Sequence, residues 1–353
     1  CPPKSPPWCA PRRQPTAPHA GWLTGEDHAP CGRLTPQPPG QVHGCGRALA
    51  RLLDQLGYRL QGGVWRHSRR QVIFLGDIID RGPRIREALH IVHDMAEAGQ
   101  ALCIMGNHEF NAVAYVTPDP LNPGDFYRPN RGNTPKAEKN RNQHAEFLRQ
   151  VGEGSAQHVA WVKWFRTLPV CLDLGGIRVV HACWDQPSVD ALWNAGWKPG
   201  ALLDDRLMAI LHEHKADGSE SSLMQARKLL TCGLEIPLPN GKAIQKDGHR
   251  FDSLRIANWR VAAQKLSDVA LLPRGQEHLI HDMEWPLGLV MSNIEGSPVF
   301  LGHHWFSGHP TIESPKLACL DWSAGKGGPL VAYRWEGEES LSDAKLVWAG
   351  AIQ

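Results

Sequence analysis

The sequence predicts an α/β fold built on a parallel β-sheet. Two short apolar segments, QVIFL at 71–75 and ALCIM at 101–105, flank a stretch in which apolar residues recur every three or four positions. Strand, helix and strand within about 35 residues form a βαβ unit, whose two strands run parallel. The chain has 353 residues, of which 42% are hydrophobic, so it is long enough to bury a large core.

The other elements follow from the same patterns. Leucines at 49, 52, 53 and 56 occupy one face of a helix that ends at Gly57. The helix between the two apolar segments is expected over 84–98, after Pro83 and before Gly99. Further buried strands are expected at 177–180 and 298–301. Three C-terminal strands, expected to be antiparallel, are 317–321, 330–335 and 345–349.

Residues 1–41 differ from the rest of the chain. The first 40 residues contain 11 of the 28 prolines and no periodic apolar pattern. Such a segment buries too little apolar surface to offset its ordering entropy, so we expect disorder there and a folded domain over 42–353.

Two insertions, at about 111–160 and 186–290, are expected to cap the core on one side. In the second insertion, Arg255 and Trp259 lie at helical spacing. They are expected to pack as a structural pair rather than to face a pocket.

The composition excludes several classes of protein. The net charge of +2 is too small to indicate a nucleic acid or a membrane surface as a partner. No apolar run reaches the length of about 18 residues that a membrane span needs, and no secretory signal is visible. The nine cysteines are scattered without a C-x-x-C pair, which favours a reducing cytoplasm over a disulfide framework.

Polar residues follow four of the predicted strands at the point where each strand ends. GDIIDRG (76–82) follows the strand at 71–75, and GNHE (106–109) follows the strand at 101–105. His181 follows 177–180, His303 follows 298–301, and His43 precedes the first helix. Ligands bind at the carboxyl ends of the strands in such sheets. Each residue alone has an ordinary explanation in turn chemistry or a local ion pair, but their recurrence predicts a shared site.

These residue types favour metal-assisted phosphate chemistry. Carboxylate, amide and imidazole ligands suit Mn, Fe, Zn or Ni. Asp77 could bridge two ions about 3.5–4 Å apart, an arrangement that lowers the pKa of a bound water and binds phosphoryl oxygens. An imidazole backed by a carboxylate, such as His108 with Asp80, is suited to protonate a leaving oxygen, and Arg81 offers a planar fork for phosphate.

The segments GDIIDRG, GNHE, VVHA and LGHH, in this order, resemble the motifs of the calcineurin-like metallophosphoesterases, near the bacterial serine/threonine phosphatases and diadenosine tetraphosphatases. The resemblance covers about residues 42–335. It implies a four-layered α/β sandwich of two mixed sheets flanked by helices. It also implies a phosphatase that hydrolyses a phosphorylated small molecule, nucleotide or phosphoprotein with two divalent metal ions, most often manganese.

The resemblance also implies roles for the metal ligands. Asp77 is the expected bridging ligand. Asn107, His181 and His303 would complete the ligands of one ion, and His43 would bind the other. A generic dinuclear amidohydrolase is disfavoured, because an arginine directly after Asp80 points to phosphate.

The catalytic roles follow from the same motifs. His108 and Asp80 resemble the family's acid dyad, and Arg81 resembles a phosphate clamp. His304 is expected to support the pocket or the ligands. Cys183 is expected to be a small buried residue, not a nucleophile.

The sequence departs from the family at its first motif, where Gln41 stands in place of a metal-binding aspartate. The preceding segment LTPQPPG (34–40) contains three prolines, so we expect the first central strand to be missing and the first metal site to be weakened. The alternative function is therefore an impaired or inactive member, acting as a binding protein or arising as a defective gene product. A replaced or out-of-frame segment over 1–41 would explain why the changed motif and the expected loss of the strand occur together.

Overall fold

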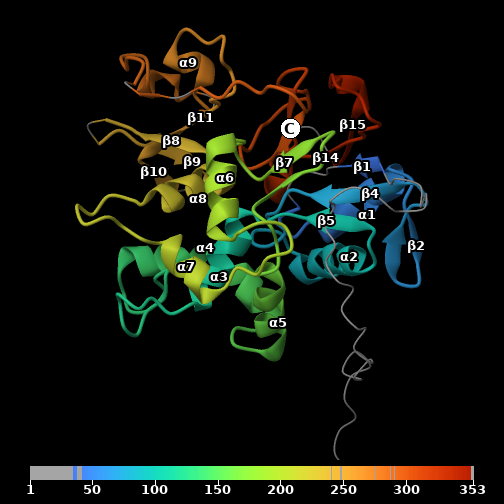
Figure 1. The fold of residues 1–353 in the computed structure, drawn as a ribbon, viewed down its shortest axis with the longest axis horizontal. Helices are drawn as coiled ribbons and strands as arrows, with labels where there is room; N and C mark the ends of the chain where they lie inside the picture. Colours follow the sequence, from blue (N-terminus) through green and yellow to red (C-terminus); the bar gives the residue numbers. More distant parts are fainter. Residues whose placement is uncertain are drawn as a thin grey trace, which may run out of the picture. The chain divides into compact units, whose positions relative to one another are not determined.

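The computed structural model describes residues 35–37, 42–239, 241–246, 249–273, 275–286, 288–289 and 291–350. These residues belong to one compact unit, Leu34–Gln353 (Figure 1). Gln41 and the rest of 1–41, apart from 35–37, lie outside the described residues, and so do the expectations that rest on them. Among the described helices, none has both the length and the apolar character that a membrane span requires.

The first sheet contains the predicted βαβ unit. Strands β1 (Thr35–Gln37), β4 (Arg70–Phe74) and β5 (Ala101–Cys103) lie in the order β1-β4-β5, and all pairs are parallel. Helix α2 (Ile85–Glu97) connects β4 to β5 and packs beside α1 (Gly46–Gln55). The expected helices and strands of this part of the chain are confirmed.

The expected loss of the first strand is not confirmed. β1 lies within the proline-rich segment and pairs with β4, with Thr35 opposite Arg70 and Gln37 opposite Val72. In the described part of the sheet, β1 has a neighbour on one side only. Proline cannot donate to a β-ladder, but a strand at a sheet edge needs only one set of hydrogen bonds. The prolines therefore rule out a strand paired on both sides, not every strand.

The second sheet is mixed. Strands β6 (Cys171–Asp173), β7 (Arg178–Val180), β12 (Val299–Leu301) and β13 (Leu317–Cys319) lie in the order β13-β12-β7-β6. β6 and β7 are antiparallel, whereas β12 is parallel to both β7 and β13. β14 (Leu330–Tyr333) and β15 (Leu346–Ala349) form the expected antiparallel pair. The expectation that 317–321 is antiparallel was wrong, because an apolar run does not reveal the direction of its neighbour.

The side chains of each sheet alternate between two apolar clusters. Val72 and Phe74 of β4 pack with α1 and α2, whereas Ile73 and Leu75 pack with Phe300 of β12. The residues on either side of Phe300 belong to the helical cluster. The two sheets therefore share a core between them and turn their other faces to helices. This confirms the predicted four-layered sandwich; of the two sheets expected to be mixed, the second is mixed, whereas the described strands of the first are all parallel.

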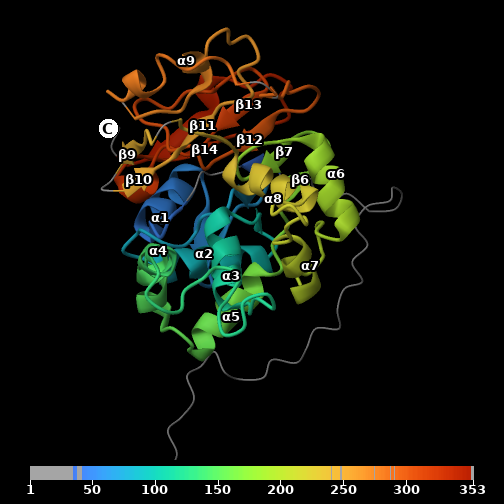
Figure 2. The ribbon, with the colours of Figure 1, turned by 90° about the vertical axis from the view of Figure 1, so that its left-hand side faces the viewer.

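The insertions surround this sandwich, and Phe147 of the first and Leu192 of the second belong to its helical cluster. The first begins within α3 (Asn107–Val116) and contains α4 (Pro135–Val151) and the first half of α5 (Ala156–Phe165). Figures 1 and 2 both place α5 and α9 (Leu266–Val269) at opposite ends of the unit. The second insertion has a small apolar core of its own. Its other helices and strands are α6 (Gln186–Ala195), α7 (Asp205–Ile210), α8 (Ser222–Cys232), β8 (Leu234–Pro237), β9 (Ile244–Lys246), β10 (His249–Phe251) and β11 (Ser253–Ile256). Outside the insertions, a hairpin of β2 (Arg59–Gln61) and β3 (Val64–Arg66) precedes β4.

Candidate metal centre

Two glycines let the loops after β4 and β5 lie in direct contact. A Cβ atom on Gly76 would lie 2.3 Å from the backbone nitrogen of Gly106. A Cβ atom on Gly106 would lie 2.4 Å from Asp77 Oδ1. Gly76 also has a φ of 80°, which glycine adopts readily. The Asp77 loop and the loop with Asn107 and His108 are therefore held together by backbone contact.

Glu109 holds the Asp77 loop in place. One carboxylate oxygen accepts hydrogen bonds from the backbone nitrogens of Asp77 (2.7 Å) and Gly106 (3.2 Å). The other accepts from Ile78 (2.8 Å) and Ile79 (3.3 Å). Burial, and then the charge of Asp77, raise the pKa of Glu109 to about 7. We did not assign this role from the sequence, although Glu109 lies in the GNHE motif.

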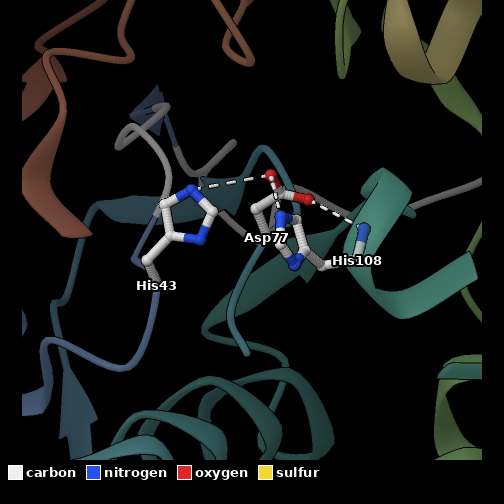
Figure 3. Close-up of side chains that lie close together, drawn as sticks. All are labelled: His43, Asp77 and His108. Carbon is white, nitrogen blue, oxygen red and sulfur yellow. Dashed lines mark hydrogen bonds and ion pairs between the residues drawn. The ribbon is translucent and has the colours of Figure 1, made fainter. Parts of the chain in front are cut away.

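The first ligand group consists of His43, Asp77 and His108, whose ligand atoms lie within 4.8 Å of one another. His43 Nε2 is 3.6 Å and His108 Nε2 is 3.8 Å from Asp77 Oδ2. Figure 3 shows both imidazoles turned toward this carboxylate. All three side chains are buried. His108, which was expected to act as the acid, is therefore also a member of this ligand group.

The second ligand group shares Asp77 with the first. It contains His181 and His303, again with ligand atoms within 4.8 Å of one another. His181 Nε2 is 3.3 Å from Asp77 Oδ1, and the Asn107 side-chain oxygen is 3.1 Å from His181 Nε2 and 3.0 Å from His303 Nδ1. Rotating the amide would present its NH₂ group to the same atoms. The structure thus brings together all five described residues expected as ligands.

The donor set fits divalent cations. Burial lowers the pKa values of His43 and His303, with Arg81 and Arg255 respectively as the next contributions, so both imidazoles are neutral and keep a lone pair. Neutral imidazole is the form that binds metal. The buried Nε2 atom of His303 has no hydrogen-bond partner among the described residues. His43, Asp77 and His303 all have positive φ angles, a strain that concentrates at functional sites.

A histidine pair surrounds the second aspartate of the GDIIDRG motif. His108 Nδ1 is 2.5 Å from Asp80 Oδ2, as expected for the acid dyad. His144 Nδ1 is 3.0 Å from the other oxygen, Oδ1. Burial alone would raise the pKa of Asp80, but the charge of His144 and the hydrogen bonds with both histidines hold it below its usual range. His144 was not anticipated, because it belongs to no motif and lies in the first insertion.

Three cationic side chains surround one indole ring beside the ligands. Arg255, Lys326 and Arg81 lie 3.9, 4.5 and 4.9 Å from the ring centroid of Trp305. Arg255 Nη1 also donates to the backbone oxygen of His303 (2.9 Å). Arg255 also pairs with Glu235 (3.1 Å), which offsets part of this positive charge, and the remaining charge suits an anionic ligand. Neither Trp305 nor Lys326 was singled out from the sequence.

The expected pairing of Arg255 with Trp259 was wrong. Arg255 lies in strand β11, not in a helix, and its guanidinium stacks on Trp305. Trp259 Nε1 donates to Glu313 instead (2.8 Å). A spacing of four residues indicates a shared face only where the segment is helical.

Two further residues occupy supporting positions. His304 is buried, and its Nε2 is 2.8 Å from the backbone oxygen of Ala182. Cys183 is buried, and burial raises the pKa of its thiol to about 12. Since a thiolate is the reactive form, Cys183 has the character of an inert core residue.

Comparisons with known proteins identify the family of the chain. A model of the calcineurin-like phosphoesterase family matches residues 40–230, more than half of the chain. The asymmetrical bis(5'-nucleosyl)-tetraphosphatase PrpE of Oceanobacillus iheyensis is 43% identical over 70 residues, which are 20% of this chain and 28% of the relative. The symmetrical bis(5'-nucleosyl)-tetraphosphatase of Aromatoleum aromaticum is 28% identical over 145 residues, 40% of this chain and 42% of the relative.

The chain thus spans between about a quarter and two fifths of the length of these two relatives. Among solved structures, a serine/threonine protein phosphatase from Saccharomyces cerevisiae gives a TM-score of 0.44 at 13% identity. The structural alignment covers 91% of this chain and 81% of the yeast phosphatase chain.

Proposed function

Because the chain belongs to the calcineurin-like phosphoesterase family, we propose that it hydrolyses a phosphate monoester or phosphoanhydride by direct attack of water. The observation that supports this most strongly is the Asp77 carboxylate, which is shared by two separate groups of imidazoles. Asp77, His43, Asn107, His181 and His303 would hold two divalent ions, of which manganese is the first candidate. Such ions would lower the pKa of a water and neutralise phosphoryl oxygens.

The protein's own side chains would carry out the remaining steps. Arg81 presents its guanidinium 3.4 Å from His108 Nε2, so a phosphoryl group bound by Arg81 would lie beside this imidazole. His108 would donate its Nε2 proton to the leaving oxygen as the P–O bond breaks. Asp80 holds the opposite nitrogen of the ring, at 2.5 Å, and thereby stabilises the imidazolium.

We further propose a nucleotide with more than one phosphate group as the substrate. The relatives are named as bis(5'-nucleosyl)-tetraphosphatases. Arg255, Lys326 and Arg81 around Trp305 provide positive charge beyond what one phosphoryl group requires. A phosphoprotein is the second substrate class.

The six described cysteines are all free thiols, which supports a reducing cytoplasm as the location.

A second candidate function follows from Gln41. A neutral amide in place of a carboxylate removes one charged ligand from the first group. The chain would then bind one ion well and the other weakly, with little or no turnover. In that case it would bind phosphorylated ligands without hydrolysing them efficiently.

Metal content and activity on one preparation test both functions. The full chain is loaded with Mn²⁺, and metal per chain is measured alongside hydrolysis of diadenosine tetraphosphate, p-nitrophenyl phosphate and a phosphoserine peptide. We expect Mn²⁺-dependent hydrolysis that Asp77→Asn abolishes and that Asp217→Asn, on an exposed loop, leaves unchanged. Metal binding without hydrolysis would favour the impaired member. Hydrolysis that persists in Asp77→Asn would refute the proposed site.

A further inference from the structure

Helix α4 of the first insertion lies against the segment that follows Asp80, the carboxylate of the acid dyad. Its Gln150 side chain accepts a hydrogen bond from the backbone nitrogen of Ile85 (2.8 Å) and donates to the oxygen of Gly82 (3.2 Å). The helix begins at a Thr134 cap whose hydroxyl accepts from the nitrogen of Ala137 (3.1 Å). The cap defines where α4 begins, and the Gln150 contacts fix the helix relative to this segment.

His144 projects from the buried face of α4 onto Asp80. The imidazole is 2% exposed, and its ring lies 4.9 Å from Phe147 and 5.1 Å from Tyr115. An ionised carboxylate only accepts hydrogen bonds, so His144 donates its Nδ1 proton to Asp80 Oδ1. The other oxygen accepts from His108 Nδ1. Both oxygens of Asp80 are thus engaged by imidazoles from different parts of the chain.

We propose that His144 is a positioning residue for proton transfer, and this inference rests on the proposed phosphoesterase function. A carboxylate bound at one oxygen can rotate about its Cβ–Cγ bond. A second hydrogen bond at the other oxygen fixes its plane. The fixed carboxylate keeps a proton on His108 Nδ1, so the proton available for transfer lies on Nε2.

The step is balanced without any further reactant. The water oxygen forms a bond to phosphorus and releases one proton to solvent, while the bond to the leaving oxygen breaks. The Nε2 proton of His108 moves to that oxygen, and His108 becomes neutral. Asp80 keeps its charge, His144 keeps its proton, and solvent returns a proton to His108.

Packing alone does not account for an imidazole at this position. The buried Nε2 atom of His144 has no hydrogen-bond partner among the described residues, which is unfavourable in an apolar setting. A phenyl ring would fill the space between Tyr115 and Phe147 without this loss. What the imidazole adds is the hydrogen bond to Asp80.

Leaving-group dependence tests this role. p-Nitrophenolate departs without a proton, whereas the alkoxide of glycerol phosphate requires one. In the Mn²⁺-loaded full chain, we expect His144→Phe to lower kcat about 10- to 100-fold for glycerol phosphate but less than about threefold for p-nitrophenyl phosphate. His158→Phe is the matched control, because His158 is also buried beside Phe147 but is hydrogen-bonded by the nitrogen of Gly154. We expect this control to change both rates equally.

Two conservative variants keep the test decisive if His144→Phe does not fold. The amide nitrogen of an asparagine lies where Nδ1 of the imidazole lies and can donate to Asp80, whereas the amide nitrogen of a glutamine lies where Nε2 lies and cannot. We therefore expect His144→Asn to restore the glycerol phosphate rate and His144→Gln to leave it low. Equal losses on both substrates, or equal rates for Asn and Gln, would overturn the positioning role. An inactive wild-type chain would instead refute the proposed function itself.

Discussion

Replacing Gly76 with alanine tests whether backbone contact between two loops builds the metal centre. The new Cβ atom would lie 2.3 Å from the nitrogen and 2.5 Å from the Cα atom of Gly106. Neither atom belongs to a side chain that could turn away, so the two loops must separate. Asp77 follows directly after Gly76, and Asn107 and His108 follow directly after Gly106. Separation therefore moves Asp77 away from its partners in both ligand groups.

The expected loss in the free energy of unfolding has two parts. A φ of 80° at a residue with a Cβ atom costs roughly 1–2 kcal/mol. Overlap in a packed interior costs about 1–3 kcal/mol more. The free energy of unfolding should thus fall by about 2–5 kcal/mol, a large part of a typical total of about 5–15 kcal/mol.

Gly63→Ala is the matched control. Gly63 has a φ of 84°, and a Cβ atom there would meet nothing within 4 Å. It therefore carries the conformational penalty alone, about 1–2 kcal/mol. Urea unfolding of the metal-free variants, with Mn²⁺ stoichiometry measured on each, separates the two parts. The reasoning is refuted if Gly76→Ala loses no more stability than Gly63→Ala and still binds as much metal as the wild type.

Three further predictions follow from other residues. Burial, and then Arg227, lower the pKa of His212 to about 4, so its contribution to stability is complete above about pH 6.5 and is lost as the pH falls toward 4. Denaturant unfolding should show a loss of up to about 3 kcal/mol between pH 7 and 4 that His212→Phe reduces, and identical pH dependence would contradict this. Gln41→Asp should raise the metal content per chain and the phosphatase rate, and no gain in either would show that the amide is not the deficit. Arg255→Ala removes a cation from the Trp305 ring and should raise KM about tenfold for diadenosine tetraphosphate and less for p-nitrophenyl phosphate. Equal changes in KM would argue against a site for additional phosphate groups.

The residue pattern was sufficient to predict the parallel strands and the position of the metal centre, whereas the four layers were expected from the family resemblance. Four apolar runs of strand length, three of them followed by glycine and all of them by polar residues, predict parallel strands whose carboxyl ends meet. In the structure, Asp77, His181 and His303 converge as this reasoning requires. The prediction succeeds because strand ends and glycine turns are local features, and the parallel arrangement brings the ends together.

The prolines of 34–40 were interpreted too strictly. They indicate a weak strand, but whether such a strand still pairs depends on its place in the sheet. Among the described strands, β1 lies at the edge of its sheet, where Pro36 needs no second partner. The direction of β13 was equally beyond the sequence pattern, since apolar alternation is the same for parallel and antiparallel neighbours.

By itself, then, the sequence determined the chemistry that the strand ends present, because the ligands and the acid dyad are adjacent to the strands that deliver them. Only the tertiary structure decided what surrounds that chemistry. His144 is 64 residues from Asp80 along the chain, and Trp305 meets Arg81 and Arg255 from three separate segments. Helical periodicity predicts which face of α4 is buried but not which residue that face meets. That partner is set by the path of the insertion and by the packing of the whole unit.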